Sequence, residues 1–409
     1  MKIRNLKGTL FSFLLLGIGS LVNSQELLPT MLDTTVANHQ LNISGNVFHH
    51  STSLTNEFTG KFLFGGEISE ELAQKTFDKQ RVYNRMGGGY HLRGEYRGIH
   101  EIFKNSPNWS WMIELSNELH AYGEYAENLM GLALLGNEPY LGERITLSGT
   151  EVRLDQFYTI GGGIHNKKTK SFITLNLVLP QNYFELNARK TYISFSENGD
   201  EITADIDGYL RRANKDAFFK GAGVAVNFDF NIPFGKQEGF NGYLGITARN
   251  LGFYGLHESR LSKVETSKSF TGFSFDDLLG DDGFPDLLDS IKVYNSTGNK
   301  YKVMPGFFQV GKIVTAHSEK KLQSFFGVRM YATQTYRPMV YAGLHYRPIS
   351  QFSFGAQGSY GGYGNFRLGL YANYTTDSFI ISAGTEDVLG LMLKSQFGRA
   401  AVIRVGWKF

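Results

Sequence analysis

The sequence contains no cysteine among its 409 residues. This absence excludes a disulfide-stabilised secreted domain and any metal site built from thiolates. It does not decide the cellular compartment, because a chain without cysteine is compatible with all of them. After the N-terminal segment there is also no apolar run of about 18 residues, which excludes membrane-spanning helices.

A strong excess of one charge is missing as well. The chain carries 41 Lys and Arg against 38 Asp and Glu. Residues 1–24 hold Lys2, Arg4 and Lys7 and no acidic residue, so their removal would leave a mature chain with balanced charges. A balanced chain gives no reason to expect nucleic acid as a partner.

Residues 1–24 predict a secretory signal peptide. A basic head is followed by an apolar stretch from Leu10 to Val22, and small Ser24 precedes a polar shift. A membrane anchor is the alternative, but the apolar stretch is short beside the roughly 20 residues of a spanning helix. We therefore expect export, with cleavage after Ser24.

Glycine and aromatic residues are abundant. The chain has 48 glycines, and aromatic residues make up 14% of it. No linker and no change of composition divides the sequence, although its length would ordinarily suggest two or three domains. Glycine and aromatic residues with strand-like segments throughout indicate one large β structure.

Alternation of apolar and polar residues is the main pattern. In the final segment "AAVIRVGWKF", Ile403, Val405 and Trp407 share one face, whereas Arg404 and Gly406 share the other. Such segments are roughly 9–13 residues long, close to the 9–11 of a tilted strand that crosses a bilayer. A water-soluble sandwich also alternates, but its strands average about 5–6 residues.

We therefore predict an all-β fold, a single closed antiparallel transmembrane β-barrel of about 14 strands, within the range 14–16, with short loop helices. Residues 86–409 are assigned to the barrel. Residues 25–85 are less regular and are interpreted as a periplasmic segment, a plug, or a first strand with a short helix. The helix is expected to begin after Ser69, with Glu70 and Glu71 in its first turn.

The polar faces of the predicted strands supply candidate lumen-lining residues. For each of them the alternative is that the charge pairs across the lumen and only braces the wall. The candidates are Arg93, Glu95, Arg97, Asn227, Asp229, Arg249, Arg329, His345, Arg347, Arg367 and Arg404.

Metal and catalytic signatures are weak. Asp281, Asp282 and Asp286 lie in an aspartate-rich segment that could hold calcium, but the EF-hand spacing is not met. A short amphipathic helix over a barrel mouth is the favoured alternative. No nucleophile–base signature occurs, so we predict no enzyme, no cofactor and no metal site at a recognisable spacing.

Several stretches carry a family resemblance. "LLGNEPYLGERITL" at 134–147, "ARNLGF" at 248–253 and the segment ending "YKVMPGFFQVGKIV" resemble an uncharacterised outer-membrane barrel family of Bacteroidota, a domain of unknown function. That family is distantly similar to FadL-type fatty-acid transporters. The end of the chain resembles the C-terminal signal that the barrel-assembly machinery recognises, with Trp407 and Phe409 at the matching positions.

The predicted location is the outer membrane of a Gram-negative, Bacteroidota-like bacterium, in contact with its lipid. Two functions stay open. The first is a channel or transporter for small or hydrophobic molecules, since a barrel of this size can enclose a ligand. The second is a non-catalytic structural or accessory subunit of an outer-membrane complex.

Overall fold

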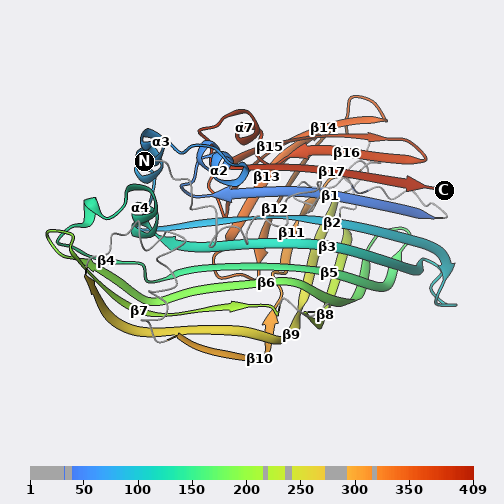
Figure 1. Cartoon of the computed structure of the whole chain (residues 1–409). Coiled ribbons are helices and arrows are strands. Elements are labelled where there is room, and N and C mark those ends of the chain that lie inside the picture. The colour runs from blue at the N-terminus through green and yellow to red at the C-terminus, as the bar shows by residue number, and fades with distance from the viewer. Residues whose placement is uncertain (1–31, 33–38, 215–219, 235–241, 272–292, 316–319) are drawn as a thin grey trace.

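The computed structural model describes residue 32 and residues 39–214, 220–234, 242–271, 293–315 and 320–409. Within these residues, seventeen strands form one antiparallel sheet. The sheet closes because β1 (Gln40–Ser51) pairs along its length with β17 (Gly398–Lys408) (Figure 1). Phe409 continues the closure, since its N–H donates to the His39 carbonyl at 3.1 Å.

Three positions around the wall are each occupied by two consecutive strand pieces. In each case both pieces pair with the same neighbouring strand, so seventeen pieces make a closed barrel of fourteen strands, as predicted. The pairs of pieces are β4 (Arg144–Thr146) with β5 (Thr150–Asn166), both along β6 (Phe172–Phe195); β7 (Glu201–Arg212) with β8 (Gly221–Phe234), both along β6 and β9 (Gly242–Thr271); and β10 (Val293–Val303) with β11 (Phe307–Ile313), both along β9.

The remaining wall strands and the helices complete the described chain. The strands are β2 (Tyr83–Glu101), β3 (Trp109–Ala126), β12 (Leu322–Tyr331), β13 (Arg337–Tyr346), β14 (Phe352–Gly362), β15 (Arg367–Thr375) and β16 (Phe379–Thr385). The helices are α2 (Asn56–Phe64), α3 (Glu70–Phe77), α4 (Glu127–Leu135), the 3-10 turn η1 (Glu138–Tyr140) and α7 (Val388–Met392). Among the described residues, no helix combines the length and the apolar character needed to cross a membrane.

The wall has an apolar outer face. On β6, for example, Leu175 is 64% exposed whereas its neighbour Asn176 is fully buried. Large exposed apolar residues recur at alternate positions on strands all around the cylinder, including Ile43, Ile113, Ile160, Phe230, Phe326, Val340 and Ile403. Because successive side chains of a strand point to opposite faces, this alternation separates an apolar outside from a polar inside.

One sector of the wall is much taller than the rest. The strands β6 and β9 contain 24 and 30 residues, and their far halves pair with β7 and β10 beyond the barrel (Figure 1, left). We call these far halves, with β4, β7 and β10, the extension. Helix α4 and η1 pack against it through Leu132, Ile145 and Phe195.

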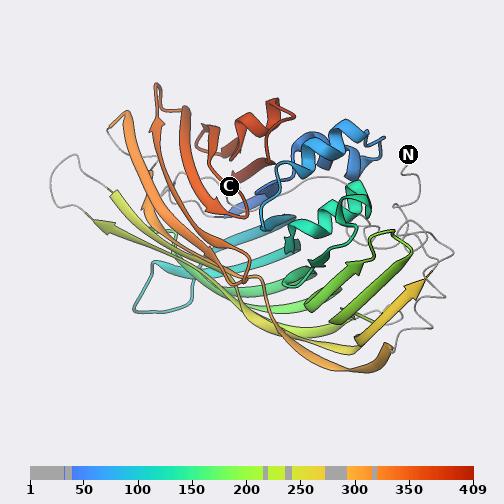
Figure 2. The same ribbon diagram turned by 90° about the vertical axis from the view of Figure 1, so that its left-hand side faces the viewer.

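The helices α2, α3 and α4 gather at the end of the barrel opposite the C-terminus (Figures 1 and 2). Leu54, Phe58 and Tyr125 form a buried cluster there, and Tyr125 shares its face of β3 with exposed Leu115. These helices therefore cover outward-facing residues of the wall above the apolar face. Helix α3 begins as predicted, with the Ser69 hydroxyl accepting from the Leu72 N–H at 3.3 Å.

The number of barrel strands agrees with the sequence prediction, but the positions of several individual strands differ from it. The wall includes β1 at Gln40–Ser51, before the predicted barrel segment. β9 is one strand where the alternation predicts two, at residues 240–252 and 262–272. The segments on either side of Gly199, whose sequence predicts either a further pair of strands or a strand-like loop, form the hairpin of β6 and β7 at the tip of the extension. The predicted signal peptide, residues 1–24, lies outside the described residues.

Candidate functional site

The barrel interior brings together polar side chains from strands that are distant in the chain. On β3, Glu114, Glu118 and His120 face inward, and each is at least nine-tenths buried. A buried carboxylate is costly unless it accepts hydrogen bonds or meets a cation. The partners of these carboxylates therefore determine how the interior is organised.

The Glu118 carboxylate joins two walls of the barrel. It accepts from the Asn250 Nδ2 of β9 at 2.6 Å and contacts the His91 Nδ1 of β2 at 2.8 Å. The strands β3 and β9 are not neighbours in the sheet, so the contact between Glu118 and Asn250 crosses the interior. Asn250 reaches inward from a backbone position with φ of 56°, next to a shift of register between β8 and β9.

Glu114 makes the second half of the same connection. It accepts from the Asn227 Nδ2 at 2.5 Å and from the Thr174 hydroxyl at 2.6 Å. The Asn227 Oδ1 accepts from the Asn250 backbone N–H at 2.6 Å. We call this set the transverse network: His91, Glu114, Glu118, Thr174, Asn227 and Asn250. It ties β2 and β3 to β6, β8 and β9.

Glycine lets the wall bend tightly beside this network. A Cβ on Gly161 would lie 1.9 Å from the Asn176 Oδ1, and one on Gly163 would lie 1.9 Å from the Ile173 carbonyl oxygen. Any larger residue would push β5 and β6 apart. The glycine run on β5 thus supports close backbone approach in a curved wall.

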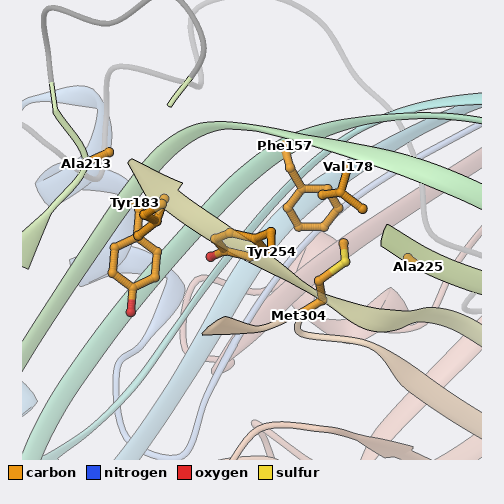
Figure 3. Close-up of a cluster of buried hydrophobic side chains, with 8 residues drawn as sticks. Phe157, Val178, Tyr183, Ala213, Ala225, Tyr254 and Met304 are labelled. Atoms are coloured by element: carbon orange, nitrogen blue, oxygen red, sulfur yellow. The ribbon is translucent and has the colours of Figure 1, made fainter. Parts of the chain in front are cut away.

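An apolar cluster fills the interior where the strand pieces are interrupted. Met304 lies between β10 and β11, is fully buried, and reaches toward Phe157 and Tyr254 (Figure 3). Its backbone N–H donates to the Gly252 carbonyl at 3.0 Å. The Tyr254 hydroxyl donates a short hydrogen bond to Asp155, which links this cluster to the polar interior.

His120 occupies the centre of an aromatic cluster. Its Nε2 lies 2.9 Å from the Tyr363 hydroxyl, and its ring centroid lies 5.0 Å from that of Tyr331 and 5.9 Å from that of Phe48. These residues come from β1, β3, β12 and the β14–β15 connection. The cluster fills the interior on the side of the transverse network nearer the helices.

Several predicted lumen residues form ion pairs inside the barrel. Arg249 holds Asp229 with two hydrogen bonds of 2.7 and 2.8 Å, and its guanidinium lies over the Phe172 ring. The Arg97 guanidinium donates to Glu95 at 2.9 Å. Arg93 is buried 3.9 Å from the Glu118 carboxylate.

Other predicted residues are buried with partners of a different kind. Arg329 donates to the Gln309 Oε1 at 2.7 Å and lies 3.6 Å from Glu386, which follows β16. Burial raises the pKa of the Glu386 carboxyl, although Arg367 and Arg329 oppose that rise. The His345 Nδ1 lies 3.0 Å from the Tyr371 hydroxyl, and Arg367 donates to the Gly361 carbonyl at 3.3 Å.

Arg347 and Arg404 are the half-buried arginines of the predicted set. Arg347 follows the end of β13, whereas Arg404 lies in the middle of β17. Ser382 and Val402, on the same inward face as Arg404, are half-buried too. The inner face of β16 and β17 is therefore less tightly covered than that of β3.

The possible calcium ligands Asp281, Asp282 and Asp286 lie outside the described residues. Within the described ranges, no group of three or more His, Asp and Glu side chains is placed to hold a metal ion. The residues that sequence reasoning missed are Glu114, Glu118 and Asn250. For Glu114 and Glu118 the sequence does carry a signal, because both alternate along β3 with the exposed apolar residues Ile113 and Leu115.

No family model and no curated protein matches the chain. Among solved structures, the chain is similar to the Pseudomonas putida toluene transporter TodX, with 10% identity, a TM-score of 0.40, and 91% of this chain and 90% of that chain covered. It is similar to the TodX deltaS2S3 mutant monoaromatic hydrocarbon channel, with 9% identity, a TM-score of 0.43, and coverage of 92% and 91%. A further similar structure is the translocator domain of the autotransporter NalP from Neisseria meningitidis, with 8% identity, a TM-score of 0.29, and coverage of 92% and 90%.

Proposed function

We propose that the chain is an integral outer-membrane barrel of a Gram-negative, Bacteroidota-like bacterium, and that it is a non-catalytic channel or transporter for small molecules, including hydrophobic ones. The observation that carries this proposal is the separation of faces: apolar side chains cover the outside of the closed wall, and charged side chains occupy its inside. A closed cylinder of this kind satisfies its backbone groups internally, as lipid requires.

The two sides of the interior support a path with a constriction. The transverse network draws β3 and β9 together, whereas Ser382, Val402 and Arg404 on the opposite side stay half-buried. Solutes would pass along β16 and β17, and the width of this path would depend on the hydrogen bonds of the transverse network. Breaking these hydrogen bonds would let β3 and β9 move apart and would widen the path.

A structural or accessory subunit is the second candidate. The same network favours it, because charges that are paired across a barrel brace the wall. Under this alternative the interior would never conduct, and the extension would present the contact surface for another protein.

Conductance of the purified full chain in planar bilayers tests the two candidates. A channel predicts measurable conductance for the wild type and a larger, steadier conductance for Glu118→Ala and Asn250→Gly. Asn117→Ala is the matched control, since Asn117 lies on the outer face of the same strand. Circular dichroism would establish that each variant is folded. Silence of all four folded proteins would overturn the channel and leave the accessory role.

A further inference from the structure

Positive charges lie side by side on the inner face of three neighbouring strands. In the register of the sheet, Ser44 of β1 stands between Arg93 of β2 and Arg404 of β17. Strands are about 4.8 Å apart, so the two arginine Cα atoms are separated by about 10 Å across Ser44. That separation suits two long side chains that converge on one small group.

The next position along the same strands adds one carboxylate. Glu95 is opposite Asn42, and the guanidiniums of Arg97, Arg93 and Arg404 all lie within electrostatic range of it. Arg97 already holds Glu95 directly. Arg93 lies 3.9 Å from the Glu118 carboxylate. Among the described residues Arg404 makes no ion pair, so its charge is the one in this sector that a bound anion could meet.

A buried donor points to the same place. Asn42 is only 3% exposed, and its Oδ1 accepts from the Gln40 Nε2 at 3.0 Å. Its Nδ2 has no hydrogen-bond partner within the part of the chain that the structure describes. An unpaired buried amide donor is costly, and a bound acceptor would remove that cost.

We infer that this sector, formed by Arg93, Arg404, Ser44 and Asn42, is a binding site for the carboxylate group of a small organic anion. The inference rests on the proposed transport function and gives its substrate class. Arginine suits a carboxylate because its planar fork donates two parallel hydrogen bonds to the two oxygens. The half-buried state of Arg404 leaves the site open to solutes inside the barrel.

Calorimetric titration of the detergent-solubilised full chain tests the site without relying on conduction. Benzoate is the probe, benzyl alcohol is its neutral counterpart, and inorganic phosphate tests for a general oxyanion site. We expect benzoate to bind at least about tenfold more tightly than benzyl alcohol, because hydrogen bonds to charged groups are the stronger ones. Equal binding of the two aromatic compounds would overturn the inference. Tighter binding of phosphate would overturn the assignment to a carboxylate.

Variants of Arg404 and Asn42 locate the binding. Arg404→Gln is expected to weaken benzoate binding at least about tenfold, and Arg404→Lys less, since it keeps the charge and loses the fork. Asn42→Ala is expected to weaken it while leaving every charge in place. Arg189→Gln is the control, because Arg189 is exposed on the extension and pairs with Asp207. Unchanged binding in folded Arg404→Gln would exclude the site.

The failure of this inference is distinguishable from that of the proposed function. A protein that binds benzoate through Arg404 but never conducts would retain the site and lose the channel. A protein that conducts, and whose folded Arg404→Gln variant binds benzoate as the wild type does, would retain the channel and lose the site.

Discussion

At the scale of single residues, Gly162 and Gly163 are adjacent on β5 but have different surroundings. A Cβ on Gly163 would lie 1.9 Å from a carbonyl oxygen of β6, whereas one on Gly162 would meet nothing closer than 3.5 Å. The backbone of β6 cannot move aside without losing its own hydrogen bonds. The requirement for glycine therefore belongs to positions 161 and 163, and not to position 162 between them.

Gly163→Ala is expected to destabilise the folded barrel by about 1–3 kcal/mol, the usual cost of forcing extra volume into a packed site. Gly162→Ala is expected to leave its stability nearly unchanged. Urea unfolding of both variants in detergent, followed by tryptophan fluorescence, gives the comparison. Equal unfolding midpoints for the two variants would show that the wall relaxes around either methyl group.

Asn250 combines a left-handed backbone with a buried hydrogen bond. Asn250→Gly keeps the backbone free to adopt the φ of 56° and removes the bond to Glu118, at an expected cost of about 1–3 kcal/mol. Asn250→Ala removes the same bond and adds strain of about 1–2 kcal/mol. The alanine variant should therefore unfold at lower urea concentration than the glycine variant, and the reverse order would contradict the strain argument.

At the scale of elements, two loops that are far apart in the chain hold each other. The Asn56 Nδ2 at the start of α2 donates to the Gly390 and Gly398 carbonyls at 2.9 Å each. The Ser51 N–H donates to the Phe397 carbonyl at 2.7 Å. The connection between β16 and β17 thus depends on the connection between β1 and β2.

Asn56→Ala is expected to speed amide hydrogen exchange in residues 388–398, because α7 loses its side-chain tie to α2. Exchange in β6 should stay as in the wild type. Glu57→Ala, one residue further along the same helix, is the matched control. Unchanged exchange around α7 in Asn56→Ala would mean that the backbone contacts alone fix this loop.

The sequence predicts elements well where alternation is strong and poorly where it is not. β17 and β12 have long apolar faces, and their alternation predicts strands at residues 399–409 and 322–333, within one or two residues of the observed bounds. β1 alternates only as far as Val47 before it becomes polar at His49 and His50, and β10 is polar on both faces. The pattern of a wall strand is therefore short in β1 and missing in β10. For the interior, alternation predicts which residues face inward, but the pairing of Glu118 with Asn250 depends on how closely two distant strands approach.

At the scale of the whole molecule, the apolar outer face should define a lipid-covered zone. The chain lacks cysteine, so single-cysteine variants report on one site each. In vesicles, Ile403→Cys and Leu368→Cys should resist a water-soluble maleimide, whereas Ser267→Cys on the extension should react quickly. Rapid labelling at Ile403 and Leu368 in the folded protein would rule out a membrane-spanning barrel.

The one-sided height of the wall has a consequence for biogenesis. The hairpins of the extension carry charged residues such as Lys190, Asp207 and Glu265, and they stand beyond the apolar face. In the proposed outer-membrane location, insertion with the extension leading would carry these charges across the hydrocarbon layer, which is unfavourable for an unassisted hairpin. The strands from β12 to β16 are joined by short connections and have no extension of this kind. Translocation of the tall hairpins is therefore expected to limit the rate at which the newly made protein matures.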